Sequence, residues 1–509
     1  MTRLMLGTLA LGLCLSTASA AEGARRPNIL LIYADDQSYK TVGCYPESWP
    51  WVKTPHLDAL ARSGVRFHGS YLGSWCMPSR ASILTGKQPH AIQSMRMEGT
   101  YPGSTYDPQQ CPFWPAVFRQ HGYHTAQIGK WHTGTDAGFG RDWDFQIVWN
   151  RPKHPENAGA YYARQLLAFN GEERWQDGYP ADNYTKWAVE CIRGAHRDAA
   201  KPWFLWLCYG NIHGPSRPAD RHKGMYKDAP VPNPIDILGP RPGKPEYLNL
   251  TQAWRRTKEG RIVAGKTDAK IGDEAGVKAV GFHEWVRQVN ECVPSVDEGV
   301  GELVRALKET GQLEHTLVVY TADQGFAMGE HGMRQKVAPY DAAYRAPLIV
   351  SLPGTVAAGK VCRYLPNAPD LVVTFHALAG IKPAWPMHGR DLTPLLKDPS
   401  APWPHPVLYE HTGHDYGDEV ARVLRDHPKE AVHSRVPWYA AVVHGGWKYI
   451  HYLPPGTPDE LYHLDNDPEE LNNLAADPKH AGKLAEMRRV LLAELERTQA
   501  PPEMTARLK

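Results

Sequence analysis

The segment from Cys76 to Arg80 combines a nucleophilic thiol with a cationic guanidinium, separated by Met77, Pro78 and Ser79. Proline fixes its own φ angle and has no N–H group to donate, so it is compatible with the start of a helix. The apolar residues that follow predict such a helix, with Arg80 in its first turn. Free N–H groups and the positive end of the helix dipole attract anions there. We therefore expect an anion-binding region that lowers the pKa of the Cys76 thiol; a buried structural cysteine is the alternative.

Two adjacent carboxylates, Asp35 and Asp36, follow the apolar run at 28–33, whose composition is typical of a strand buried on both faces. The two side chains repel each other unless a cation or basic groups compensate their charge. Hard divalent cations bind carboxylate oxygens in this way. The pair therefore indicates a cation site, with a solvated turn as the alternative.

Four apolar runs, at 28–33, 124–128, 203–209 and 316–321, alternate with helical patterns. This alternation predicts an α/β fold with a large, mostly parallel sheet between two layers of helices. Ligands bind beyond the carboxyl ends of the strands in such sheets. Seven polar residues fall at these ends: Asp35, Asp36, Lys130, His132, His213, Asp323 and Gln324. Each alone has a structural explanation, such as a surface lysine or a hydrogen-bonded imidazole, but their coincidence at one edge predicts an active site.

The remainder of the chain predicts two regions, a main one at 21–385 and a smaller one at 386–509. Residues 215–282 are rich in proline, glycine and charge, and we interpret them as a peripheral insertion near the mouth of the site. Its basic cluster either faces an anionic substrate or is simply solvated, and consists of Arg255, Arg256 and Lys258. Two short strands around Gly445-Gly446 predict a hairpin, and a helix is expected at about 478–498. These patterns predict a small antiparallel sheet with one packed helix.

The charges nearly cancel, with 57 Lys+Arg against 55 Asp+Glu in 509 residues, which gives no argument for nucleic acid as a partner. Residues 1–20 have the positive, apolar and small-residue regions of a signal peptide. The apolar run is too short for a membrane anchor, so we expect a secreted or periplasmic protein. Seven cysteines remain after cleavage, and their pairing cannot be read from the sequence.

The order Cys76-x-Pro78-Ser79-Arg80 resembles the signature of the type I, formylglycine-dependent sulfatases, which have an alkaline phosphatase-like fold. The resemblance extends over nearly all of the mature chain apart from 215–282 and parts of 385–435. Other motifs occur in the order of the family, namely Asp35-Asp36, Gly129-Lys130-Trp131-His132, His213, Asp323-Gln324-Gly325 and Lys336. One position departs from the family pattern: Gln324 stands where Asn or His is usual.

The resemblance implies that a maturation enzyme converts Cys76 to formylglycine, whose hydrated aldehyde is the nucleophile. One Ca²⁺ would be held by Asp35, Asp36, Asp323, Gln324 and an oxygen of the modified Cys76. By the same resemblance, Asp323 is the base for the attacking hydroxyl, and Arg80, Lys130 and Lys336 neutralise the sulfuryl charge. His213, with Lys336, protonates the departing alcohol, and His132 takes a proton from the second hydroxyl.

The resulting hypothesis is an exported sulfatase that acts on sulfated carbohydrate, whether a small molecule or an oligosaccharide. The export signal and the high aromatic content, with 17 Trp and 24 Tyr, favour carbohydrate. The enzymatic alternative is a phosphodiesterase or phosphonate monoester hydrolase of the same superfamily. The third hypothesis is a binding protein that keeps the fold without the chemistry.

Overall fold

The computed structural model describes residues 26–97, 103–265 and 280–509, so the predicted signal peptide lies outside the described residues. A ten-stranded sheet forms its centre, in the order β14-β2-β13-β12-β1-β9-β5-β6-β7-β8. Its middle is parallel and comprises β12 (Thr316–Ala322), β1 (Asn28–Ala34), β9 (Trp203–Cys208), β5 (His124–Trp131) and β6 (Phe145–Asn150). The flanking strands are β13 (Leu348–Ser351), β2 (Val65–Phe67), β14 (Lys360–Cys362), β7 (Gln165–Phe169) and β8 (Glu172–Gln176). Because β13 and β7 are antiparallel to their inner neighbours, the sheet is mixed at its margins.

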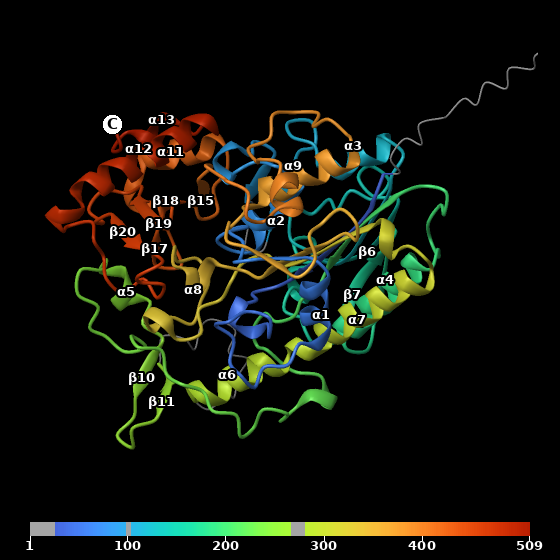
Figure 1. Ribbon diagram of the computed structural model, residues 1–509, viewed down its shortest axis with the longest axis horizontal. Coiled ribbons are helices and arrows are strands. Elements are labelled where there is room, and N and C mark those ends of the chain that lie inside the picture. Colours follow the sequence, from blue (N-terminus) through green and yellow to red (C-terminus); the bar gives the residue numbers. More distant parts are fainter. Residues whose placement is uncertain (1–25, 98–102, 266–279) are drawn as a thin grey trace, which may run out of the picture.

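Helices cover both faces of this sheet (Figure 1). Ile29, Leu31 and Tyr33 of β1 pack into one core and the intervening residues of the strand into the other, since successive side chains of a strand point to opposite faces. The first core is closed by α2 (Cys76–Thr85), α3 (Trp114–Gln120) and α9 (Ala368–Ala379). The second is closed by α1 (Pro55–Ser63), α4 (Pro180–Ile192) and α7 (Val293–Glu309). The predicted α/β fold is confirmed.

Helix α2 begins at Cys76 itself, after an extended Trp75, so Arg80 opens the second turn and not the first as predicted. Pro78 is accommodated because the first N–H groups of a helix have no partner within it. The chain before the helix runs very close to it: a Cβ atom on Gly73 would lie 2.5 Å from the Cα atom of Ser79. Only glycine permits this approach, which brings Cys76 up to the sheet.

The C-terminal sheet is antiparallel and comprises β15 (Val407–His411), β18 (Tyr439–His444), β19 (Trp447–Tyr452) and β20 (Glu460–His463). The predicted hairpin joins β18 to β19, and Gly445 and Gly446 both have positive φ angles, 57° and 78°. One face of the sheet packs against α12 (Ala481–Arg497), as predicted. The opposite face, with Tyr409 and Tyr439, belongs to the same core as α2 and α9.

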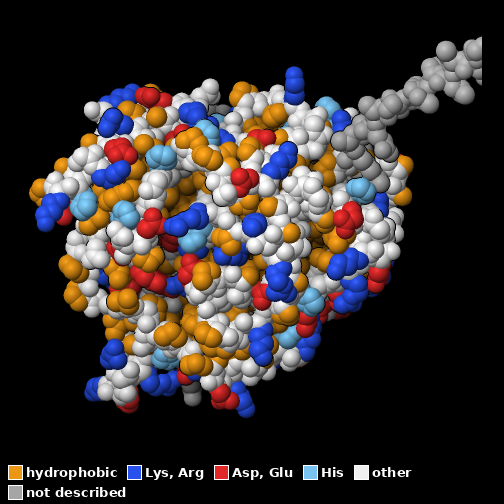
Figure 2. All heavy atoms as spheres, viewed as in Figure 1, with side chains coloured by type: hydrophobic (Ala, Val, Ile, Leu, Met, Phe, Trp, Pro, Cys, Tyr) orange, Lys and Arg blue, Asp and Glu red, His pale blue; other side chains and the backbone are white. Residues whose placement is uncertain are grey.

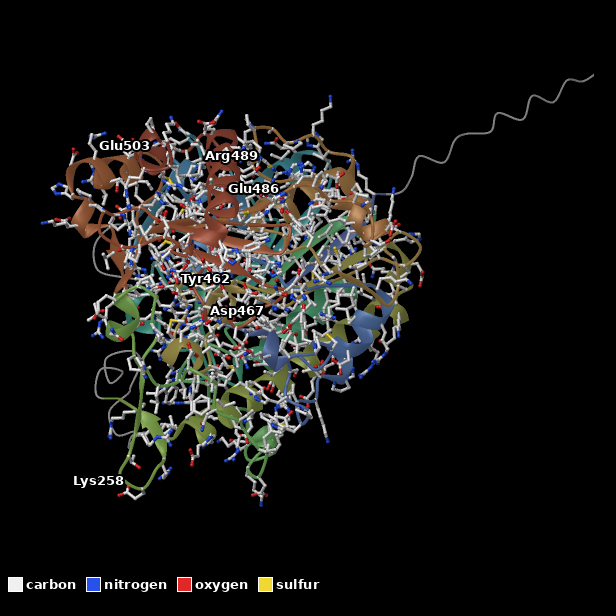
Figure 3. All side chains as sticks on the ribbon, turned by 60° about the vertical axis from the view of Figure 1, so that its left-hand side comes forward. Lys258, Tyr462, Asp467, Glu486, Arg489 and Glu503 are labelled. Carbon is white, nitrogen blue, oxygen red and sulfur yellow. The ribbon has the colours of Figure 1, made fainter. Side chains whose placement is uncertain are left out.

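The insertion carries a hairpin of β10 (Trp254–Arg256) and β11 (Ile262–Ala264), and is followed by α6 (Phe282–Glu291). Arg255 and Arg256 are exposed, and Lys258 projects from the hairpin tip away from the body of the molecule (Figure 3). The basic cluster is therefore a solvated one. Shorter elements are α5 (Tyr247–Leu250), α8 (Asp341–Tyr344), α10 (Thr393–Lys397), α11 (Asp418–Asp426), α13 (Pro502–Thr505), β3 (Met95–Met97), β4 (Ser104–Tyr106), β16 (Val432–His433) and β17 (Val436–Pro437).

Acidic and basic side chains are interspersed over the face seen in Figure 2, without a continuous patch of one sign. This agrees with the near-zero net charge of +2. Within the described ranges, no helix has both the length and the apolar character needed to cross a bilayer.

A buried histidine, His90, links the region of the central sheet to the C-terminal sheet. Its Nδ1 atom lies 2.6 Å from Glu410 Oε2 and its Nε2 atom 2.9 Å from the carbonyl oxygen of Thr498. Both ring nitrogens face acceptors, so the ring is satisfied when both carry protons. Burial opposes the charge, but the Glu410 carboxylate outweighs it and raises the pKa of His90 above its usual value.

A histidine with a raised folded-state pKa contributes stability below the pKa of the unfolded chain and loses it as pH rises through the folded value. We therefore expect His90→Gln to lower the free energy of unfolding by about 2 kcal/mol at pH 6, the size of a charge-assisted hydrogen bond, and by less at pH 9. Thermal unfolding of the mutant and wild type across this range measures the difference. His315→Gln, at an exposed position, is the control. If the loss of unfolding free energy in His90→Gln is the same at every pH, His90 is not charged in the folded protein.

Candidate active site

The predicted residues meet at one edge of the central sheet. Asp35 and Asp36 follow β1, and Asp323 and Gln324 follow β12, the parallel neighbour of β1. The N–H group of Asp36 donates to Asp323 Oδ1 at 3.0 Å, which joins the two strand ends directly. Lys130 lies in β5, His132 directly follows this strand, and His213 follows β9. Cys76 and Arg80 lie in α2, and Lys336 lies in the loop before α8. Strand adjacency therefore brings together the residues at the strand ends, with Lys130 still inside β5.

The Cys76 thiol lies in the middle of this group and is almost fully buried. Its Sγ atom is 3.3 Å from Asp35 Oδ1 and 3.2 Å from the Nζ atom of Lys336. Burial, and after it the negative charge of Asp35, raises the pKa of Cys76 to about 12. The predicted lowering of this pKa is wrong, because desolvation and the neighbouring carboxylate outweigh the helix terminus and the nearby lysines. As a thiol, Cys76 is therefore a poor nucleophile.

The acidic residues around Cys76 suit a hard divalent cation. One oxygen each of Asp35, Asp36 and Asp323, and the Cys76 Sγ atom, all lie within 4.8 Å of one another. The amide of Gln324 points its Nε2 atom at Asp36 and Cys76, whereas its buried Oε1 atom has no hydrogen-bond partner among the described residues. A half-turn of the amide exchanges the two atoms and directs Oε1 into the cluster. Asp35, Asp36, Asp323 and Gln324 then offer four oxygens, a donor set that fits a hard cation such as Ca²⁺.

Three cationic side chains compensate the carboxylates. Arg80 Nη2 lies 3.1 Å from Asp323 Oδ2, and its Nη1 atom donates to the carbonyl oxygen of Lys130 at 3.2 Å. The ammonium of Lys130 donates to Asp35, and that of Lys336 lies 2.6 Å from Asp36 Oδ1. Each cation thus touches a carboxylate at the cluster, and any anion that enters the site meets positive charge on several sides.

Environment separates the carboxylates by pKa. Burial alone would raise the pKa of Asp35, but the neighbouring positive charges, that of Lys130 above all, hold it well below its usual value. Burial and the charge of Asp35 raise the pKa of Asp323 to about 7, despite the opposing effect of Arg80. Such divergence between adjacent carboxyl groups is typical of acid–base sites, and a carboxylate with a pKa near neutrality is suited to accepting a proton.

Two histidines, His132 and His213, border the cluster. Their pKa values are lowered, whereas the pKa of Lys336 is raised. His213 Nε2 is 3.6 Å from Asp36 Oδ2, and burial lowers the pKa of His213 to about 3. His132 is fully buried, and burial, reinforced by Arg151 and Lys130, holds its pKa well below the usual value. Burial would also lower the pKa of Lys336, but Asp36 outweighs it and the pKa is raised well above the usual value. Both imidazoles are therefore neutral, while Lys336 carries a proton.

Two residues of the site escaped the sequence analysis. Arg151 Nη1 lies 3.1 Å from His132 Nδ1, and the Tyr161 ring stacks on His213 at 4.0 Å between centroids. Arg151 directly follows β6, so the strand-end rule would have found it had the run at 145–150 been recognised as a strand. Tyr161 lies in an irregular segment without any such signal.

A cleft of about 1050 Å³ lies next to the segment that carries His213, although none of the predicted site residues lines it. Tyr162 connects the two, since its hydroxyl donates to the His213 carbonyl oxygen at 2.7 Å and its side chain lines the cleft. Tyr179 adds a second aromatic ring, and Arg217 and Arg287 are among the charged residues of the lining. Aromatic faces and guanidinium groups are the contacts that bind sugar rings with acidic substituents.

Comparison with known proteins matches a sulfatase family model to residues 27–381 and a model for the C-terminal part of N-sulphoglucosamine sulphohydrolase to 329–499. The N-acetylglucosamine-6-O-sulfatase of Bacteroides thetaiotaomicron is 28% identical over 533 residues, which covers 96% of this chain and 89% of the relative. A structure in complex with its substrate D-glucosamine-2-N,6-O-disulfate has a TM-score of 0.77 at 24% identity and covers 93% of this chain and 98% of its own. Phosphonate monoester hydrolase of Agrobacterium radiobacter has a TM-score of 0.67 at 23% identity, with coverages of 93% and 96%. These structural likenesses extend over both the central and the C-terminal sheet.

Proposed function

Because the chain belongs to the sulfatase family and is thus a sulfuric ester hydrolase, we propose that it is an exported enzyme that removes sulfate from carbohydrates at Cys76. The supporting observation is the geometry around this residue: three carboxylates lie next to Cys76, and each of them is paired with a cationic side chain. A sulfate ester needs both: cations for its own charge, and a base for the nucleophile.

We propose that a maturation enzyme converts Cys76 to formylglycine. The family and the order Cys76-x-Pro78-Ser79-Arg80 support this conversion, and the unmodified thiol, whose pKa is raised, would be a poor nucleophile. Formylglycine supplies, as its hydrate, the attacking hydroxyl group. Asp35, Asp36, Asp323 and Gln324 would hold one Ca²⁺, which supplies Lewis-acid polarisation of the sulfate ester when bound. Asp323 accepts the proton of the attacking hydroxyl at its carboxylate, while Arg80, Lys130 and Lys336 bind the sulfuryl oxygens.

The departing alcohol needs a proton, and Lys336 and His213 are the candidates for its source. Lys336 holds a proton because of Asp36, whereas His213 is neutral. We propose that the Lys336 ammonium provides the proton and that His213, fixed by the ring of Tyr161, hydrogen-bonds to the leaving oxygen. Neutral His132, with Arg151 orienting its ring, then accepts a proton from the second hydroxyl at residue 76. The bond between the residue-76 carbon and the sulfate oxygen breaks, sulfate leaves and the aldehyde forms again.

A sulfated sugar of the glycosaminoglycan type is the substrate class that we propose. The relative named for N-acetylglucosamine-6-O-sulfate and the structure named for a glucosamine disulfate support it, as does the aromatic and cationic cleft beside His213. The cleft is joined to the His213 segment through Tyr162, and its volume leaves room for a sugar next to the sulfated one. Phosphonate or phosphodiester hydrolysis is the second candidate, supported by a fold likeness with a lower TM-score.

The test is a substrate panel on the mature enzyme. We expect release of sulfate from 6-O- or N-sulfated glucosamine, with a higher kcat/KM for a sulfated disaccharide than for the monosaccharide or for nitrophenyl sulfate. Matched nitrophenyl phosphodiester and phosphonate esters should be hydrolysed at least about a hundredfold less efficiently, since the loss of preorganised contacts costs several kcal/mol. Preference for the phosphorus esters would overturn the assignment, and equal rates on aryl and saccharide sulfates would overturn the role of the cleft.

A further inference from the structure

The residue after Lys336 has an unfavourable backbone conformation. Val337 has a φ angle of +86°, in the left-handed region where a β-branched side chain is a genuine outlier. Such conformations persist only when the surrounding structure imposes them, and they concentrate at functional sites. Rotation about this φ angle turns the Lys336–Val337 peptide relative to the Val337 carbonyl. The angle therefore determines the direction in which Lys336 leaves the loop towards Cys76.

A tyrosine of the C-terminal sheet holds this conformation from the other side. The Tyr439 hydroxyl, at the start of β18, donates to the Val337 carbonyl oxygen at 2.6 Å, and both residues are buried. Tyr439 is itself fixed by its neighbours, because its ring packs against Tyr409 and Tyr452. The carbonyl of Val337 is thus bound to a rigid element, and its peptide cannot turn without breaking a buried hydrogen bond.

We propose that Tyr439 is a positioning residue for the sulfatase reaction, which keeps Val337 left-handed and thereby directs the Lys336 ammonium at Cys76 and Asp36. Tyr439 contacts neither the substrate nor the reacting atoms in this assignment. Without its hydroxyl, Val337 relaxes towards negative φ, and Lys336 Nζ moves away from residue 76 and from Asp36 Oδ1, from which it lies 2.6 Å. The inference rests on the proposed role of Lys336.

The chain provides a matched control for this effect. Tyr409, on the adjacent strand β15 and on the same face of the sheet, donates its hydroxyl to the Pro339 carbonyl oxygen at 2.7 Å. Tyr409→Phe therefore deletes an equivalent buried hydrogen bond to the same loop, three residues beyond Lys336 and away from the left-handed position. A purely structural role predicts equal effects for the two tyrosines.

We expect Tyr439→Phe to lower kcat about tenfold with KM little changed, and Tyr409→Phe to leave kcat within about twofold of wild type. Both should lower the melting temperature by a similar amount. Val337→Gly is the decisive addition, because glycine adopts positive φ without strain. In Val337→Gly the loss of the Tyr439 hydroxyl should cost little, so the double variant should have a higher kcat than Tyr439→Phe alone.

Additive effects of Val337→Gly and Tyr439→Phe on kcat would overturn the proposal, as would equal kcat losses in the two tyrosine variants. Lys336→Ala separates this inference from the function on which it rests. If Lys336→Ala retains full activity, the role of Lys336 in the proposed function fails. If Lys336→Ala is inactive while Tyr439→Phe is normal, the proposed function stands and only the positioning role is lost.

Discussion

Cys76→Ala is expected to abolish sulfate release, with kcat lowered at least about ten-thousand-fold, as is typical when a nucleophile is removed. Alanine offers neither an aldehyde nor a thiol at the point where the carboxylates and cations converge. The substitution fills nearly the same space, so the fold should be retained. Sulfate release from a sulfated glucosamine, measured alongside the melting temperature, tests both statements.

Two measurements make this result specific. Cys191→Ala removes another buried cysteine, in α4, and should leave kcat unchanged. Mass spectrometry of the tryptic peptide 67–80 should detect the aldehyde in active enzyme and the thiol in inactive enzyme produced without maturation. Turnover by Cys76→Ala within a few-fold of wild type, or an active enzyme that contains only thiol, would contradict the formylglycine mechanism.

Removal of divalent cations is expected to lower kcat at least about a hundredfold, because Lewis-acid stabilisation is worth several kcal/mol. Ca²⁺ should restore activity better than Zn²⁺, since the proposed ligands are oxygens. Activity after chelation and metal addition, together with the melting temperature, measures this. Because Ca²⁺ would bind the folded state and not the unfolded chain, it should also raise the melting temperature.

Asp35→Asn tests whether the effect arises at this site. The substitution removes a ligand charge and leaves the buried ammonium of Lys130 without its carboxylate partner, so Ca²⁺ should restore neither activity nor the melting temperature. Asp220→Asn, which alters an exposed carboxylate of the cleft, should respond to Ca²⁺ like the wild type. Full activity in the absence of metal would remove Asp35 and Asp36 from the proposed cation site.

The sequence predicted where the reactive residues would meet more reliably than how they would behave. Parallel strands end at a common edge, so recognising the runs that became β1, β5, β9 and β12 was sufficient to bring Asp35, Lys130 and Asp323 together. Lys336 lies in a loop and was found only through family resemblance. Arg151 was missed because its strand, β6, was not recognised, and Tyr161 because loops have no periodicity.

The pKa shifts of the site residues could not be predicted from the sequence, because they depend on burial and on neighbours that only the fold provides. The position of Cys76 at a helix start predicted a lowered pKa, but the opposite shift results from the closeness of Asp35, which comes 41 residues earlier in the chain. The same applies to Asp323, whose pKa is raised by burial away from water and by the nearby charge of Asp35. Local patterns specify elements and caps, whereas a protonation state is a property of the assembled interior.

The inner face of the C-terminal sheet shares one core with the central sheet, and this has a consequence for how the molecule must fold. Nearly the entire polypeptide must be synthesised before Tyr409 and Tyr439 can pack against the apolar side chains of α2 and α9 in this core. Until then the nascent chain exposes the apolar side chains that form this core in the folded protein.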